Sequence, residues 1–198
     1  MDRTDAELLE AASSGDAEAF SELFRRHVDA VTRYSLRRCA SAEDVGDLVG
    51  DCFFVALQRA HCYVPQTPTA LPWLFGIARR LVAKQRRAYA SARRLEAKAA
   101  NTYPAFTASE EEAVNDAIDA ARQAPLLEEA LAALPKSERD VLELVAYDGL
   151  TPTEAATALE ITPNAARLRL SRARRSVRAH LDEHSAVLLL DGEHGYAI

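Results

Sequence analysis

Hydrophobic residues recur every three or four positions through most of the chain, and this spacing predicts helices rather than strands. A short helix is expected over residues 5–14, closed by Gly15, and Asp16 is the expected N-cap of a second helix. The second helix has its apolar stripe at Phe20, Leu23, Phe24, His27, Val31 and Tyr34. These two segments predict that the fold begins with a pair of amphipathic helices.

The third predicted helix has one apolar face and one acidic face. Ser41 and Asp44 have the spacing of a capping box at its start. The apolar positions that follow are Val45, Leu48, Val49, Cys52, Phe53 and Ala56, and the opposite face carries Glu43, Asp47, Asp51 and Gln58. One face is therefore expected in the core and the other in solvent.

A basic helix is predicted after a proline-containing loop over residues 61–71. Pro72 suits the first turn of a helix, because its missing N–H has no partner there. The expected buried stripe is Trp73, Leu74, Ile77, Ala78, Leu81 and Val82, and the remaining surface holds Arg79, Arg80, Lys84, Arg86 and Arg87. For Trp73 alone, the simplest interpretation is a core anchor.

The C-terminal half predicts a helix-turn-helix unit. Residues 99–124 are alanine-rich and acidic and are interpreted as a linker, after which apolar stripes resume at Leu126. Threonine–proline pairs at 151–152 and 162–163 start a short helix near residues 152–159 and a longer one near 163–181. Glycine often occupies the turn position held here by Glu160. Either Glu160 adopts the left-handed conformation, at a cost of about 1–2 kcal/mol, or the turn is formed differently.

Charge is unevenly distributed along a chain whose net charge is -6. Residues 61–100 hold eight basic residues and one acidic, and residues 151–180 hold six basic and two acidic. Basic islands in an acidic chain favour contact with nucleic-acid phosphates while limiting non-specific binding. The 198 residues contain no long apolar run and no secretory h-region, and the three cysteines lack zinc-finger spacing, so a reduced cytoplasmic location without a membrane span is expected.

The longer C-terminal helix carries six arginines and no acid between Asn164 and His180. Arginine can grip guanine or phosphate with two hydrogen bonds, and Asn164 could read adenine. A solvated helix face is the usual explanation of a charge run, but no acid is available here for pairing within the helix. The pattern therefore favours duplex DNA as the target.

The motifs of both halves resemble those of the sigma-70 family, and in particular its small extracytoplasmic-function (ECF) branch. The resemblance to region 4 rests on Leu134-Pro135, Glu138-Arg139, Gly149, Glu154-Ala155 and residues 169–174. Two positions differ from the family pattern: Ala165-Ala166 replaces the usual Thr-Val, and Arg167 replaces the usual lysine. The resemblance to region 2 rests on residues 47–53 and 73–80, where Gly50 stands in place of a common glutamine and Arg80 in place of a common asparagine. The two resemblances cover about residues 16–95 and 126–181.

The resemblance implies an all-α fold of two small helical domains and the function of an ECF sigma factor, which directs promoter-specific initiation by core RNA polymerase. The expected boundaries are a region 2-like domain over 1–98, an acidic linker over 99–124, a region 4-like domain over 125–182 and a tail over 183–198. The loop from Cys62 to Ala70 would capture a flipped base of the melted -10 element. The implied partners are core polymerase, through its clamp helices and flap, promoter DNA, and an anti-sigma factor or other regulator.

The resemblance also implies three sets of site residues. The -35 element would be contacted by Asn164, Arg167, Arg169, Arg172 and Arg174. The -10 element would be contacted by Cys62, Tyr63, Trp73, Arg79, Arg80, Lys84 and Arg87. Core polymerase would be bound by Asp47, Asp51, Phe54 and Gln58.

Two other function classes stay open at the level of sequence. One is a stand-alone DNA-binding regulator with a sensory N-terminal half, which would have no need of the basic helix after Trp73. The other is an anti-sigma-like adaptor, which would bind polymerase without choosing promoters. No catalytic or cofactor motif is present, His61 and Cys62 leave a redox or metal role open, and the apolar residues 186–190 could pack on the C-terminal domain or dock on a regulator.

Overall fold

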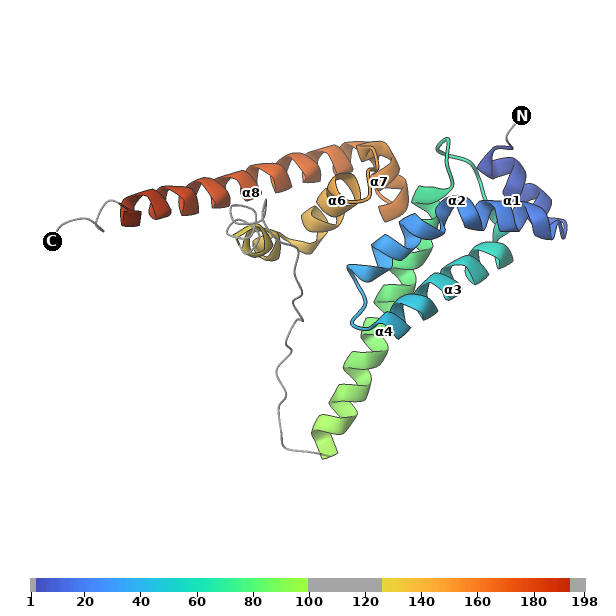
Figure 1. Ribbon diagram of the computed structural model, residues 1–198, viewed down its shortest axis with the longest axis horizontal. Helices are drawn as coiled ribbons and strands as arrows, with labels where there is room; N and C mark the ends of the chain where they lie inside the picture. Colours follow the sequence, from blue (N-terminus) through green and yellow to red (C-terminus); the bar gives the residue numbers. More distant parts are fainter. Residues whose placement is uncertain (1–2, 100–125, 193–198) are drawn as a thin grey trace.

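The computed structural model describes residues 3–99 and 126–192, with side chains over 3–89 and 126–183, and all regular structure in these ranges is helical (Figure 1). The N-terminal segment contains α1 (Asp5–Ser13), α2 (Ala17–Leu36), α3 (Ala42–Gln58), the 3₁₀ turn η1 (Ala60–Cys62) and α4 (Leu71–Ala99). The C-terminal segment contains a helix over residues 126–133, then α6 (Lys136–Ala146), α7 (Pro152–Leu159) and α8 (Pro163–Gly192). The prediction of an all-α fold is confirmed.

The helix starts follow the predicted caps, although at Ser41 only one half of the predicted capping box forms. The Asp16 carboxylate accepts from the backbone N–H groups of Glu18 and Ala19, and the Ser41 hydroxyl accepts from that of Asp44. Thr151 and Glu154 complete a capping box with Pro152 as the first helical residue. These bonds satisfy backbone donors that lack a partner inside the helix, so the local sequence sets where each helix begins.

In the N-terminal segment α2, α3 and α4 pack together, and α1 packs against α2 and η1 (Figure 1). Leu8 and Leu9 of α1 are fully buried with Leu23 of α2, with Ala60 at the start of η1 and with Ala70 just before α4. The predicted stripe of α2 is largely buried, but at its edge the ring of Phe24 lies on Phe53 and stays partly exposed.

In the C-terminal segment α7 and α8 form the predicted helix-turn-helix. Glu160 joins them in the left-handed conformation, with φ 56° and ψ 43°. Of the two possibilities considered from the sequence, the chain thus adopts the strained left-handed turn. Ala155 and Ala156 of α7 are buried together with Ala166 of α8, and their small side chains allow the two backbones to approach closely.

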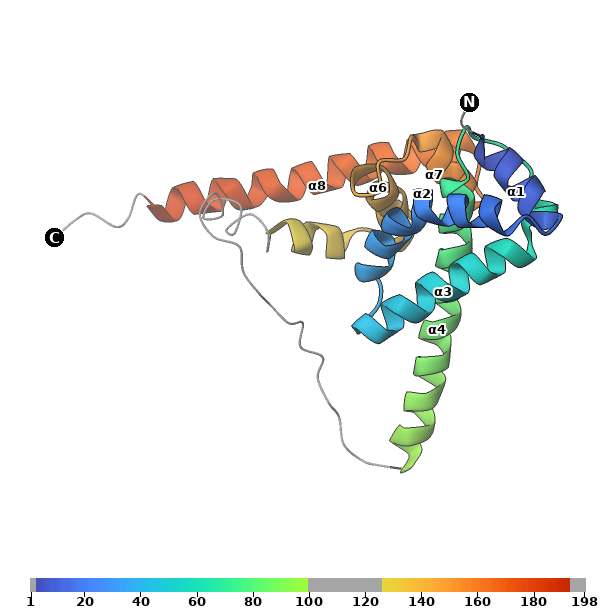
Figure 2. The same ribbon diagram turned by 45° about the vertical axis from the view of Figure 1, so that its right-hand side comes forward.

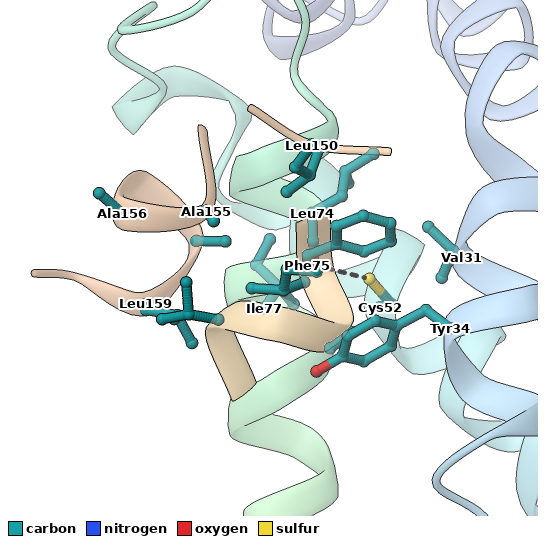
Figure 3. Packing of buried hydrophobic residues seen from close by; sticks show 14 of the residues in the cluster. Val31, Tyr34, Cys52, Leu74, Phe75, Ile77, Leu150, Ala155, Ala156 and Leu159 are labelled. Carbon is teal, nitrogen blue, oxygen red and sulfur yellow. Dashed lines mark hydrogen bonds between the residues drawn. The ribbon is translucent and has the colours of Figure 1, made fainter. Parts of the chain in front are cut away.

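The two segments share one buried core, which the local sequence patterns do not predict. Figure 3 shows Leu74, Phe75 and Ile77 of α4 between Val31, Tyr34 and Cys52 on one side and Leu150, Ala155, Ala156 and Leu159 on the other. A Cβ atom built on Gly76 would lie 3.4 Å from the carbonyl oxygen of Ala158, so α4 and α7 approach closely at this glycine.

Three ion pairs also join the segments. Arg37 pairs with Asp148, Arg80 pairs with Glu160, and Arg38 Nη2 lies 2.6 Å from Glu143 Oε2. Arg38 additionally covers the ring of Tyr34, with its guanidinium carbon 3.8 Å from the ring centroid. The N-terminal and C-terminal segments are therefore held together by apolar packing and by charge.

Two long helices extend from this shared core in different directions. The C-terminal part of α4 and the C-terminal part of α8 both run away from it, as Figures 1 and 2 show from two sides. The α8 helix continues to Gly192, beyond the predicted end near residue 181. Residues 100–125 lie outside the described part, and so does most of the predicted linker. The side chains of residues 184–192 are not described either, so the predicted packing of the apolar residues 186–190 lies outside the described residues.

Candidate nucleic-acid interface

The arginines of α8 form a solvent-facing basic surface. Ala166, Leu170 and Ala173 are buried against α6 and α7, which turns the opposite side of the helix outward. Asn164, Arg167, Arg172, Arg174, Arg175 and Arg178 are exposed, and Arg169 is half-buried. No salt bridge joins any of these arginines to an acid within the described residues, so their charge is available to a ligand.

The arginines divide between the two flanks of this surface. Arg167 and Arg174 line a groove of about 470 Å³ together with Pro152 at the start of α7. Arg169 and Arg172 do not line this groove. Successive residues of a helix are about 100° apart, and this rotation places Arg169 and Arg172 on the other flank of the exposed surface.

Two further arginines belong to the same groove, although the predicted -35 set omitted them. Arg175 and Arg178 line it beside Arg167 and Arg174. Residues 167, 174 and 178 follow one another at intervals of seven and four, which is the spacing of a single helix face. This periodicity could have identified Arg178 from the sequence.

A second candidate surface lies at the loop between η1 and α4. The rings of Tyr63 and Trp73 meet at a centroid distance of 5.0 Å, and Cys62 is exposed beside them. Trp73 is half-buried, so it is both a packing residue and part of the surface. These residues line a cavity of about 590 Å³, and aromatic rings beside a cavity of this kind suit stacking with an unpaired base.

The opposite wall of this cavity comes from the C-terminal segment. Thr153, Thr157 and Ile161 line it, and Glu160 pairs with Arg80 at its edge. The helix-turn-helix therefore covers part of the surface that the resemblance assigns to the -10 element.

The basic residues of α4 point in two directions. Arg80, Lys84 and Arg87 share the face of α4 that begins at Trp73, because they follow it at seven, eleven and fourteen residues. Arg79 instead lines a cleft of about 510 Å³ between α2, α4 and α6, where Arg86 and Arg139 also lie. The structure thus separates Arg79 from the other residues of the predicted -10 set.

The predicted polymerase-binding residues form one exposed face of α3. Asp47, Asp51, Phe54 and Gln58 are all exposed, and 59% of the Phe54 surface is accessible. An apolar ring among acidic residues on an otherwise polar, solvent-exposed helix face suits a protein partner.

The cysteines and histidines offer no metal centre in the described part of the chain, where no group of three or more metal-ligating side chains is found. Cys52 is buried and its thiol points to the carbonyl oxygen of Leu74, and burial raises its pKa to about 12. His61 and Cys62 are exposed at η1. Among the described helices, none is long and apolar enough to cross a membrane.

Comparison with known proteins gives matches over both segments. The family described as Sigma-70 region 2 matches residues 23–94, and the family described as Sigma-70, region 4 matches residues 125–177. The chain is 27% identical to the ECF RNA polymerase sigma factor SigL of Mycobacterium tuberculosis over 88% of its own length and 96% of that protein. It is 30% identical to the RNA polymerase sigma factor CarQ of Myxococcus xanthus over 88% of its own length and 96% of that protein.

A solved structure is also similar. The structure of CnrH in complex with the cytosolic domain of CnrY has a TM-score of 0.62 and 27% identity, and the match covers 91% of this chain and 99% of that one.

Proposed function

The chain belongs to the ECF branch of the sigma-70 family, whose members are promoter-recognising sigma factors of RNA polymerase, and we propose that it recognises -10 and -35 elements through two separate basic surfaces. The observation that carries the proposal is the presence of these surfaces, one on α8 and one at α4 and its preceding loop. It acts as a non-catalytic initiation factor, in the cytoplasm where polymerase and promoters are found.

The C-terminal surface is proposed to bind the -35 duplex. An α-helix fits the major groove of B-DNA, and arginine there can contact base edges or phosphates. Asn164 and Arg167 lie near the N-terminal end of α8, which is the end of a recognition helix that usually reaches the bases. Arg169, Arg172 and Arg174 would then contact the flanking phosphates.

The N-terminal surface is proposed to bind the melted -10 element. Cys62, Tyr63 and Trp73 would form the pocket for an unstacked base. The basic face of α4 that contains Arg80, Lys84 and Arg87 would follow the adjoining phosphates, and Arg79 would contact them only from the edge of that face.

The exposed face of α3 is proposed to bind the clamp helices of polymerase through Asp47, Asp51, Phe54 and Gln58, while residues 125–182 approach the flap. Residues 1–98 and 125–182 would act as the two promoter-binding domains, joined by residues 99–124. An anti-sigma factor or other regulator is a further expected partner, since CnrH was solved with a second protein, the cytosolic domain of CnrY.

The arrangement of the two segments is proposed to be a closed form that opens on polymerase. Glu160 and its neighbours cover the cavity beside Trp73, and the Arg80 side chain is paired with Glu160. While α7 is packed on α4, it would therefore block part of the surface that a DNA strand has to reach.

Run-off transcription with purified core RNA polymerase tests the proposed function. Genomic templates should give transcripts only when the protein is added, and the mapped start sites should share sequences at -10 and -35. A protein that binds DNA tightly by itself and never stimulates initiation would be a stand-alone regulator. One that binds core polymerase without selecting start sites would be an adaptor.

A further inference from the structure

A buried carboxylate links the first helix to the loop that precedes α4. Asp5 is the first residue of α1 and only 6% of its surface is exposed. Its Oδ2 atom lies 2.7 Å from Nε2 of His27, 2.8 Å from the backbone nitrogen of Ala70 and 3.0 Å from the hydroxyl oxygen of Thr69. Its Oδ1 atom lies 3.2 Å from Nη1 of Arg26.

All four partners donate to Asp5, because an ionised carboxylate can only accept hydrogen bonds. Two of them belong to α2 and two belong to the end of the loop, so one side chain connects three parts of the fold. Hydrogen bonds to a charged group are about twice as strong as neutral ones, and they are directional. Asp5 therefore fixes where the loop ends and where α4 begins.

The loop has little other backbone support. Within the part of the chain that the structure describes, residues 64–68 form no backbone–backbone hydrogen bond. Thr69 is the main internal connection, since its hydroxyl also accepts from the N–H of Leu71 and its carbonyl accepts from the hydroxyl of Thr67. The position of the loop thus depends on its two ends.

The apolar face of α1 supports both ends. Leu8 and Leu9 are buried with Ala60, just before the loop, and with Ala70, at its end. Tyr63 and Trp73 pack at the margin of the same cluster. The rings that line the cavity are consequently positioned on the surface that Asp5 and α1 hold in place.

We propose that Asp5 is a positioning residue for -10 recognition, acting through Thr69 and Ala70 to preform the base-binding loop. The inference rests on the proposed function of that loop. Asp5 does not line the cavity, so it would act on the loop without touching the base. Its effect is to remove loop freedom before binding, so that less conformational entropy is lost when the base enters.

The test compares three variants of the full chain in complex with core polymerase. Thr69→Val removes the hydroxyl that donates to Asp5 while keeping the shape of the side chain, and Asp5→Asn removes the charge. Asp16→Asn is the control, because Asp16 is another carboxylate of the N-terminal segment, but it caps α2 and pairs with Arg3 rather than contacting the loop. The probe is a fluorescent single strand carrying the non-template -10 sequence of a promoter that the wild-type protein transcribes.

The measured quantity is the affinity for this strand divided by the affinity for a strand with a scrambled -10 sequence. Asp5→Asn and Thr69→Val should lower the ratio by about tenfold, the effect of roughly one charge-assisted hydrogen bond. Asp16→Asn should leave it unchanged, and binding to core polymerase should be normal in all three. An unchanged ratio in Thr69→Val would overturn the proposal, even if Asp5→Asn folds poorly. A wild-type protein that directs no transcription would instead contradict the proposed function.

Discussion

Among single residues, Glu160 shows a local conflict that the fold accepts. A side chain at φ 56° is strained, and glycine would adopt this conformation freely. The compensation visible in the structure is the ion pair with Arg80, but both side chains are largely exposed, so the pair contributes little to stability.

Glu160→Gly is therefore expected to raise the free energy of unfolding by about 0.5–1 kcal/mol, because relief of the strain exceeds the loss of an exposed ion pair. Urea denaturation followed by circular dichroism measures the change. Glu160→Ala is the control, since it keeps the strain, and it should be neutral or slightly destabilising. Destabilisation by glycine would show that the ion pair matters more than the backbone conformation.

Arg167→Ala tests the predicted DNA contact. If Arg167 reads a base, the variant should lose about 1–3 kcal/mol of binding at the cognate -35 element and little at a mutated one. Holoenzyme binding to both duplexes measures this. Equal losses on the two sequences would assign Arg167 to a phosphate instead.

Asp5 also predicts a dependence of stability on pH. Burial raises the pKa of its carboxyl, but hydrogen bonds from His27 and Ala70 outweigh that effect and hold the pKa well below its usual range. A lowered folded-state pKa gives stability that is present above the unfolded pKa of about 3.9 and lost as the pH falls toward the folded value. The unfolding free energy of the wild type should therefore exceed that of Asp5→Asn at about pH 6, and the difference should shrink below about pH 4. A constant difference across this range, measured by urea denaturation, would contradict the linkage.

Among the helices, α3 has one buried face and one exposed face, and polymerase binding is proposed for the exposed one. Cys52, Phe53 and Ala56 are buried, while Asp51 and Phe54 project into solvent. Periodicity predicted this division correctly, because one turn of helix places residues three or four apart on the same side.

Asp51→Arg should weaken binding to core polymerase while leaving thermal stability nearly unchanged, because the side chain is exposed and has no ion-pair partner among the described residues. Competition against another sigma factor for limiting core polymerase measures the effect, which should be about tenfold in affinity. Asp29→Arg, at an exposed position of α2, is a suitable surface control. Unchanged competition would refute the docking role of α3.

Across the whole molecule, charge and apolar packing hold the N-terminal and C-terminal segments together. Arg38 and Glu143 form a partly buried pair between α6 and the residues that follow α2. Breaking such a pair by reversing one charge leaves the other without a partner, and this is strongly unfavourable.

Glu143→Arg should therefore weaken the closed arrangement and increase the radius of gyration measured by small-angle X-ray scattering. The double variant Arg38→Glu with Glu143→Arg restores opposite charges and should recover the compact form. Equal scattering from the single variant and the wild type would show that the apolar core alone holds the segments together.

Local sequence predicted where the helices lie, most of their caps and the division of each into apolar and charged faces, because these depend on residues within one or two turns of each other. It placed the end of α8 near residue 181, short of the observed end at Gly192. The sequence motifs in both halves also indicated the family. The pairing of Asp5 with Thr69 and Ala70, and of Glu160 with Arg80, could be learned only from the folded chain. These pairs join residues more than sixty positions apart, and their geometry follows from how the helices pack rather than from any local pattern.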